Sequence, residues 1–129
     1  MNSELLGNIL KTCSLCHRKL SARDLIFDPA LDIIGMIYDE YDQKSFYVFQ
    51  HNLEDCGTSL MVDTDLFKPY IEEPISDKLI IFSPACEGHC VDIDDLQACS
   101  QNCRNAPFRH FLLFMREQKA KKKVPLGEP

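Results

Sequence analysis

The fold is decided by residues 33–50, which read IIGMIYDEYDQKSFYVFQ. Residues 33–38 are apolar apart from Gly35, and residues 45–50 contain an aromatic and β-branched run. The polar residues 39–43 that separate the two runs are typical of a turn between paired strands. This stretch therefore predicts a β-hairpin at the centre of a small antiparallel sheet.

The flanking residues extend this sheet. Residues 58–62 predict a third strand, and residues 78–82 predict one more. A single helical turn is expected near residues 65–68, and Pro69 should end it because proline cannot continue the turn. Residues 21–32 combine Ser, Asp and Pro with scattered apolar side chains, which predicts a loop.

Helices are expected at both ends of the chain. Residues 3–10 form an amphipathic pattern that predicts a short helix. Asn105 is a candidate helix cap with Pro107 in the first turn, and the apolar residues that follow recur at helical spacing on one side. This second stripe consists of Phe108, Phe111, Leu112 and Met115. The predicted fold class is therefore α+β, a small antiparallel sheet with N- and C-terminal helices.

Length and composition indicate one domain. The chain has 129 residues, of which 45% are hydrophobic and 26% are charged. These values are typical of a globular protein, and the longest apolar runs are too short for a membrane-spanning helix. We expect a single metal-stabilised domain over residues 1–129, with possible subregions at 1–72 and 78–123.

Seven cysteines in a chain of this size indicate metal binding. Structural zinc sites use four tetrahedral ligands, commonly four Cys or three Cys with one His. The spacing predicts two such sites, a mixed one near the hairpin and an all-thiolate one in the last third of the chain. The mixed site comprises Cys13, Cys16, His51 and Cys56, and the all-thiolate site comprises Cys86, Cys90, Cys99 and Cys103.

The geometry of the second site depends on a local prediction. Asp94 with Gln97 three residues later is a plausible capping box, which predicts a short helix reaching Cys99. Cys99 and Cys103 would share one face if this segment is helical. The turn that contains Gly88 would then bring Cys86 and Cys90 to meet them.

Other uses of these residues remain open. His17 or His89 can replace His51 as a ligand, and the second set can carry an iron–sulfur cluster. The thiols can also be buried without any metal, because free cysteine packs as a small hydrophobe. Cys-x-x-Cys-His over residues 13–17 matches a haem-attachment pattern, but attachment requires an exported chain and no leader is visible.

Charge and compartment narrow the partners. The absence of a visible leader predicts a cytoplasmic, reducing setting. The net charge is −6, with nine Lys or Arg against eighteen Asp or Glu in residues 1–115. This acidic body disfavours nucleic acid, although a basic C-terminal stretch can still contact an anionic partner. That stretch consists of Arg116, Lys119, Lys121, Lys122 and Lys123.

No catalytic residues are predicted. Phosphate-binding glycine loops and nucleophile motifs are absent, paired acids such as Glu72-Glu73 fall in predicted turns, and His110 lies alone on the last helix. The predicted function is a non-enzymatic, zinc-stabilised cytosolic module for protein interaction or regulation, without a membrane partner. The alternatives are a redox or metal sensor on the second cysteine set, with a cluster or labile zinc-thiolate, a nucleic-acid-binding regulator, and an enzyme with an open zinc. The sequence predicts neither the partner nor the oligomeric state.

Overall fold

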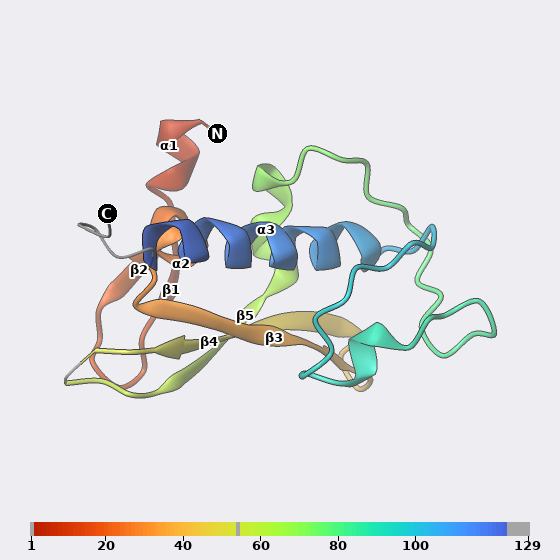
Figure 1. The fold of residues 1–129 in the computed structure, drawn as a ribbon, viewed down its shortest axis with the longest axis horizontal. Coiled ribbons are helices and arrows are strands. Elements are labelled where there is room, and N and C mark those ends of the chain that lie inside the picture. The colour runs from red at the N-terminus through yellow and green to blue at the C-terminus, as the bar shows by residue number, and fades with distance from the viewer. Residues whose placement is uncertain (1, 54, 124–129) are drawn as a thin grey trace, which may run out of the picture.

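The computed structural model describes residues 2–53 and 55–123 (Figure 1). Its centre is a three-stranded antiparallel sheet in the order β3-β4-β5. The strands are β3 (Leu31–Asp39), β4 (Lys44–His51) and β5 (Ser59–Asp63). Ile33 pairs with Phe49, and Phe49 pairs in turn with Leu60. The predicted hairpin and the predicted third strand are therefore confirmed.

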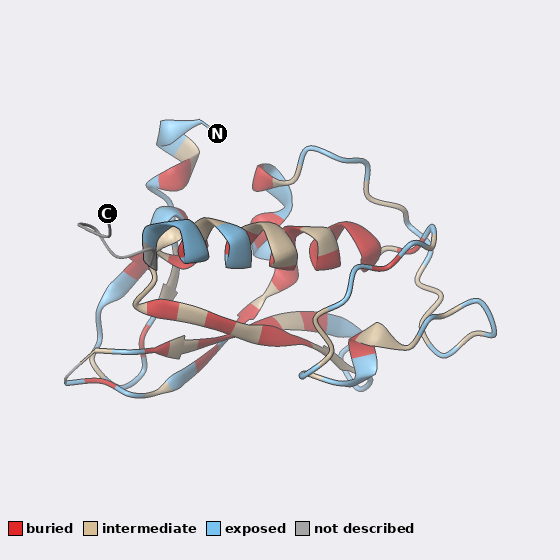
Figure 2. Cartoon of the chain, in the orientation of Figure 1, coloured by how far each residue is buried: buried red, intermediate tan, exposed pale blue. Residues whose placement is uncertain are grey.

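The helix α3 (Ala106–Lys123) lies across one face of this sheet (Figure 1). Its predicted apolar stripe is buried, and the Tyr47 hydroxyl on β4 donates a hydrogen bond of 2.6 Å to the Phe108 carbonyl. The short helix η1 (Thr64–Tyr70) completes the core by placing Phe67 between Tyr47 and Phe111. Buried residues are concentrated in the strands beneath α3 and in its first turns (Figure 2).

Two expectations about helical segments need qualification. Pro69 lies inside η1 rather than ending it, because the Ile71 N–H still closes the last turn on the Lys68 carbonyl at 3.2 Å. No helix in the described part of the chain is long and apolar enough to cross a membrane.

The N-terminal region forms a separate two-stranded ribbon. α1 (Ser3–Leu6) is only the first turn of the helix expected at residues 3–10, and β1 (Ile9–Thr12) follows it. β1 pairs antiparallel with β2 (Lys19–Ser21). The loop expected at residues 21–32 is wrong, because α2 (Ala22–Phe27) lies there. Ser21 and Asp24 form a reciprocal capping box that starts this helix.

Residues 71–105, all of them described, contain no regular element except η2 (His89–Val91). The strand expected at 78–82 and the helix expected at 94–99 are therefore wrong. The side chains of Asp92 and Asp95 accept hydrogen bonds from backbone N–H groups two residues further on, at 2.9 and 3.0 Å. Such local bonds favour turns over helix.

Two contacts fix this irregular segment to the rest of the fold. Gly35 on β3 lies directly against the Ile93 carbonyl, and a Cβ atom at this position would overlap it. Arg109 on α3 is fully buried and donates hydrogen bonds to three backbone carbonyls of the segment. These are the carbonyls of Gln97 at 2.8 Å, His89 at 3.1 Å and Asp95 at 2.5 Å.

Candidate metal centre

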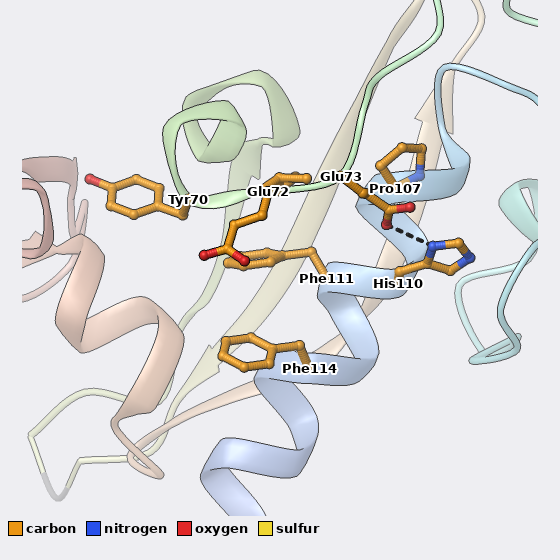
Figure 3. Close-up of a pocket in the computed structure, with 8 residues that line it drawn as sticks. Tyr70, Glu72, Glu73, Pro107, His110, Phe111 and Phe114 are labelled. Atoms are coloured by element: carbon orange, nitrogen blue, oxygen red, sulfur yellow. Dashed lines mark hydrogen bonds and ion pairs between the residues drawn. The ribbon is translucent and has the colours of Figure 1, made fainter. Parts of the chain in front are cut away.

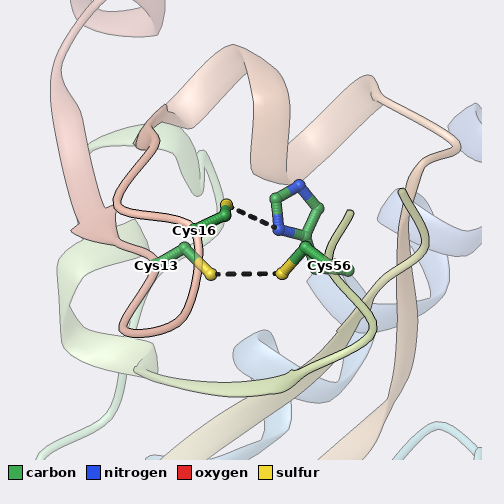
Figure 4. Close-up of side chains that lie close together, drawn as sticks. Cys13, Cys16 and Cys56 are labelled. Atoms are coloured by element: carbon green, nitrogen blue, oxygen red, sulfur yellow. Dashed lines mark hydrogen bonds between the residues drawn. The ribbon is translucent and has the colours of Figure 1, made fainter. Parts of the chain in front are cut away.

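Four side chains with metal-binding atoms meet between the ribbon and the sheet. They are Cys13, Cys16, His51 and Cys56, and their ligand atoms all lie within 4.8 Å of one another. Figure 4 shows the three sulfurs directed toward one another beside the imidazole ring. The structure therefore brings together the first predicted set.

Local backbone geometry positions the two ribbon cysteines. Cys13 follows β1, and the turn of residues 13–17 is closed by the His17 N–H, which donates to the Cys13 carbonyl at 2.9 Å. A second bond of 2.9 Å, from the Cys13 N–H to the Arg18 carbonyl, returns the chain toward β2. His17 has a φ of 63° in this turn and does not belong to the metal-binding group.

The other two ligands come from the sheet. His51 ends β4, and its N–H donates to the Thr58 carbonyl at 2.9 Å. The chain then turns back, with Leu53 and Cys56 exchanging backbone hydrogen bonds of 3.0 Å in both directions. Cys56 is thereby returned to the side of His51, just before β5 begins.

The distances fit tetrahedral coordination. The Sγ atoms of Cys13 and Cys56 are 3.6 Å apart, and Cys16 Sγ is 3.8 Å from His51 Nδ1. Ligands bound to one tetrahedral zinc ion at normal bond lengths lie about 3.5–3.8 Å apart. A disulfide requires about 2.05 Å between sulfurs, so the Cys13–Cys56 pair is spaced for a shared ion rather than a covalent bond.

Burial and electrostatics also favour a cation here. Cys13, His51 and Cys56 are each at most 2% exposed. Burial acts to raise the pKa of Cys13, but N–H groups of the turn and the neighbouring His51 lower it to about 6. The pKa of Cys56 is raised, because burial and the adjacent Cys13 and Cys16 outweigh the backbone hydrogen bond at Thr58. A divalent ion removes this conflict by allowing all three thiols to ionise.

An ion pair connects the two ligand-bearing loops at the surface. Arg18 makes a two-pronged contact with Asp55, with both N–O distances at 3.2 Å. Hydrogen bonds from Arg18 lower the pKa of the Asp55 carboxyl. Both side chains are exposed, so the pair contributes little to stability by itself. No sequence pattern signalled it, because the two residues are joined only by the folded loops.

The second predicted set is placed differently. Among the described residues, Cys86, Cys90, Cys99 and Cys103 do not reach the mutual spacing of the first set. Cys90 belongs to the main core, and Cys99 and Cys103 form a smaller cluster with Ala106. The assignment of these four residues as ligands stays a prediction.

His89 is engaged elsewhere. One ring nitrogen lies 2.8 Å from an Asp95 carboxylate oxygen, and the other lies 3.3 Å from Glu87. Because both nitrogens face carboxylates, neither is directed at the first set. Of the three candidate histidines, the structure brings His51 to the cluster.

The predicted basic stretch is only partly a surface. Lys119 is 2% exposed, and its ammonium group contacts the Leu31 carbonyl and lies 4.9 Å from the centre of the Phe49 ring. The sequence pattern did not reveal this burial. Lys121 pairs with Glu117, Lys122 lies over the Phe27 ring and Arg116 is exposed, whereas the side chain of Lys123 lies outside the described residues.

A groove of about 430 Å³ runs between residues 70–73 and the first half of α3 (Figure 3). Phe111 and Phe114 stack at 5.5 Å between ring centres and form its apolar side. Glu73 bonds His110 Nδ1 at 2.7 Å, while Figure 3 shows the Glu72 carboxylate turned toward the side that Phe111 forms. Sequence reasoning missed this groove, because Glu72 and Glu73 resemble ordinary turn acids.

The fold and the site together define a small α+β protein with a cluster of three cysteines and one histidine that can bind a metal ion. Comparison of the chain with protein-family models, with curated proteins and with solved structures finds no match.

Proposed function

We propose that this protein is a non-enzymatic, zinc-stabilised module that binds another protein. The observation that carries the proposal is the closed character of the first cluster. Four protein side chains already stand at tetrahedral spacing around one point, and three of them are buried. Catalytic zinc sites use three protein ligands and keep one position for water or substrate, whereas structural sites use four.

Zinc is the ion that this donor set suits best. Thiolate sulfur with imidazole nitrogen in a tetrahedral arrangement favours zinc over the oxygen-preferring cations. The ion would connect the ribbon loop, through Cys13 and Cys16, to the ends of β4 and β5, through His51 and Cys56. We place the protein in the cytoplasm, where a reducing environment keeps these thiols available for metal.

The groove beside α3 supplies the surface for a partner. In the described part of the chain nothing pairs with the Glu72 carboxylate, and the aromatic wall beside it suits a cation with an aliphatic stem. Residues 1–115 carry an excess of acidic side chains, which favours a basic partner. We propose that a lysine- or arginine-bearing segment of a partner protein occupies this groove.

Metal analysis tests the first part of the proposal. Elemental analysis of anaerobically purified protein is expected to find zinc, and a Cys13→Ser variant is expected to lose one zinc per chain. A chelator should lower the melting temperature of the wild type. If the wild type contains no metal and melts identically with and without chelator, the proposal is wrong and the four side chains are core residues.

The groove has its own test by NMR. N-acetyl-lysine methylamide should shift the Phe111 and Phe114 resonances more than its uncharged norleucine counterpart does. Glu72→Gln should remove that difference, whereas Glu117→Gln, an exposed control on α3, should preserve it. Equal shifts from both probes would contradict a site for a cationic side chain.

A further inference from the structure

We propose a second zinc site, held by Cys86, Cys90, Cys99 and Cys103 and independent of the first cluster. The two turns that carry these residues lie side by side. Glu87, next to Cys86, accepts hydrogen bonds from the Ser100 N–H at 3.2 Å and from Gln101 Nε2 at 3.0 Å. The Ser100 hydroxyl bonds the same carboxylate. Since Ser100 follows Cys99, these bonds hold the first turn against the second.

Two of the sulfurs already accept backbone hydrogen bonds. The Gly88 N–H donates to Cys86 Sγ at 3.3 Å, and the Ile80 N–H donates to Cys103 Sγ at 3.4 Å. Gly88 has a φ of 84°, which glycine adopts without strain. Donation of this kind stabilises a thiolate, the form of cysteine that binds metal. The turns are thus built around these sulfurs as acceptors.

Positive and donor groups lie beside the fourth cysteine. Burial raises the pKa of the Cys90 thiol, whereas the nearby Arg109 guanidinium and Asn105 amide act to lower it. The amide nitrogen of Asn105 is buried and has no hydrogen-bond partner among the described residues. Four thiolates around a divalent ion carry a net charge of −2. Arg109 offsets part of this charge, and Asn105 supplies an unused donor.

Without a cation the remaining thiols oppose one another. Burial raises the pKa of Cys99, and the charges of Glu87, Cys103 and Cys86 raise it further. The sulfurs are therefore close enough to interact, although they are not yet at coordination spacing. Because residues 71–105 lack regular structure apart from η2, small changes in turns and side-chain torsions can bring the four sulfurs together. The bonds from Arg109 and the contact at Gly35 keep the segment in place meanwhile.

Counting metal ions per chain distinguishes this site from the first. Full-length protein purified anaerobically with zinc is expected to hold two ions. Cys99→Ser and Cys13→Ser should each hold one, and the double variant should hold none. Ser100→Ala, which changes the neighbouring residue but removes no ligand, should keep two. If Cys99→Ser retains the wild-type zinc content, the second site does not exist.

Cobalt substitution identifies the ligands even if one variant folds poorly. Sulfur-to-cobalt charge-transfer absorption grows with the number of bound thiolates, so Cys13→Ser should show a spectrum of four thiolates at its single remaining site. Cys99→His should restore the second ion lost in Cys99→Ser. A Cys13→Ser protein without metal would overturn the second site while leaving the first possible. Iron with inorganic sulfide, lost in Cys99→Ser, would overturn the zinc assignment in favour of a cluster.

Discussion

The sulfur atoms of Cys13 and Cys56 lie 3.6 Å apart, although 43 positions separate the two residues along the chain. The side chain of His51 and the sulfur of Cys16 complete the same group. A metal ion bound there cross-links the ribbon to the sheet, and the magnitude of that constraint can be compared with a disulfide. Closing a loop of this length stabilises a fold by about 4 kcal/mol in the chain-entropy model.

Replacement of Cys56 by Ser should therefore lower the free energy of unfolding by at least about 3 kcal/mol, because one ligand and the cross-link are lost together. Urea unfolding followed by circular dichroism measures the change. A chelator provides the control, since it should destabilise the wild type and leave Cys56→Ser almost unaffected. Equal sensitivity of both proteins to the chelator would contradict a role for Cys56 as a ligand.

Arg109→Met should cost about 2–4 kcal/mol of stability. The substitution keeps an apolar stem but leaves the carbonyls of His89, Asp95 and Gln97 without their donor in a buried setting. Arg116→Met, on the exposed side of the same helix, is the matched control and should change stability by less than about 0.5 kcal/mol. Similar unfolding midpoints for the two variants would show that the buried hydrogen bonds are unimportant.

Gly35→Ala should destabilise the protein by about 1–3 kcal/mol, because the new methyl group would overlap the Ile93 carbonyl and displace the segment from β3. Gly57→Ala adds the same methyl group where nothing lies within 4 Å, so it should be nearly neutral. Thermal denaturation of both variants gives the comparison. A neutral Gly35→Ala would mean that the segment does not pack on β3 in solution.

Tyr47 should give stability a dependence on alkaline pH. Burial raises the pKa of its hydroxyl above the ordinary value of 10.0, so the folded chain keeps the proton that the unfolded chain releases. The contribution is complete below pH 10 and is lost as the pH rises above it. The stability difference between wild type and Tyr47→Phe should therefore shrink from pH 9 to about 11.

The control for this prediction is Tyr41→Phe. Tyr41 is 99% exposed, so its hydroxyl should ionise equally in the folded and unfolded chains. The difference between wild type and Tyr41→Phe should stay constant over the same pH range. A constant difference for Tyr47→Phe as well would contradict the buried, hydrogen-bonded position of this hydroxyl.

Sequence reasoning succeeded where a pattern is long or repeated. The hairpin, the strand β5 and the stripe on α3 follow from strand and helix periodicity, and the first cluster follows from cysteine spacing. It failed for short elements whose start depends on one local contact. α2 begins at the reciprocal hydrogen bonds of Ser21 and Asp24, inside a stretch whose composition is typical of a loop.

Residues 71–105 and Lys119 show a different limit. The aspartates at 92 and 95 have the composition of helix caps, yet their side chains close local turns that only the fold around them selects. Lys119 belongs to a charged run, but its aliphatic stem packs over Phe49 while its ammonium group finds a backbone carbonyl. Tertiary contacts decide both cases, and no spacing rule encodes them.

The placement of the first cluster also sets an order for events during synthesis. Cys13 and Cys16 leave the ribosome well before His51 and Cys56, and all of β3 and β4 lies between the two pairs. The early pair must therefore wait, exposed and partly ionised, until the hairpin is complete. During that interval an oxidant can convert the two thiols to a disulfide, which would prevent them from binding the ion. The yield of correctly folded protein therefore depends on the redox state of the cell and on the supply of metal to the growing chain.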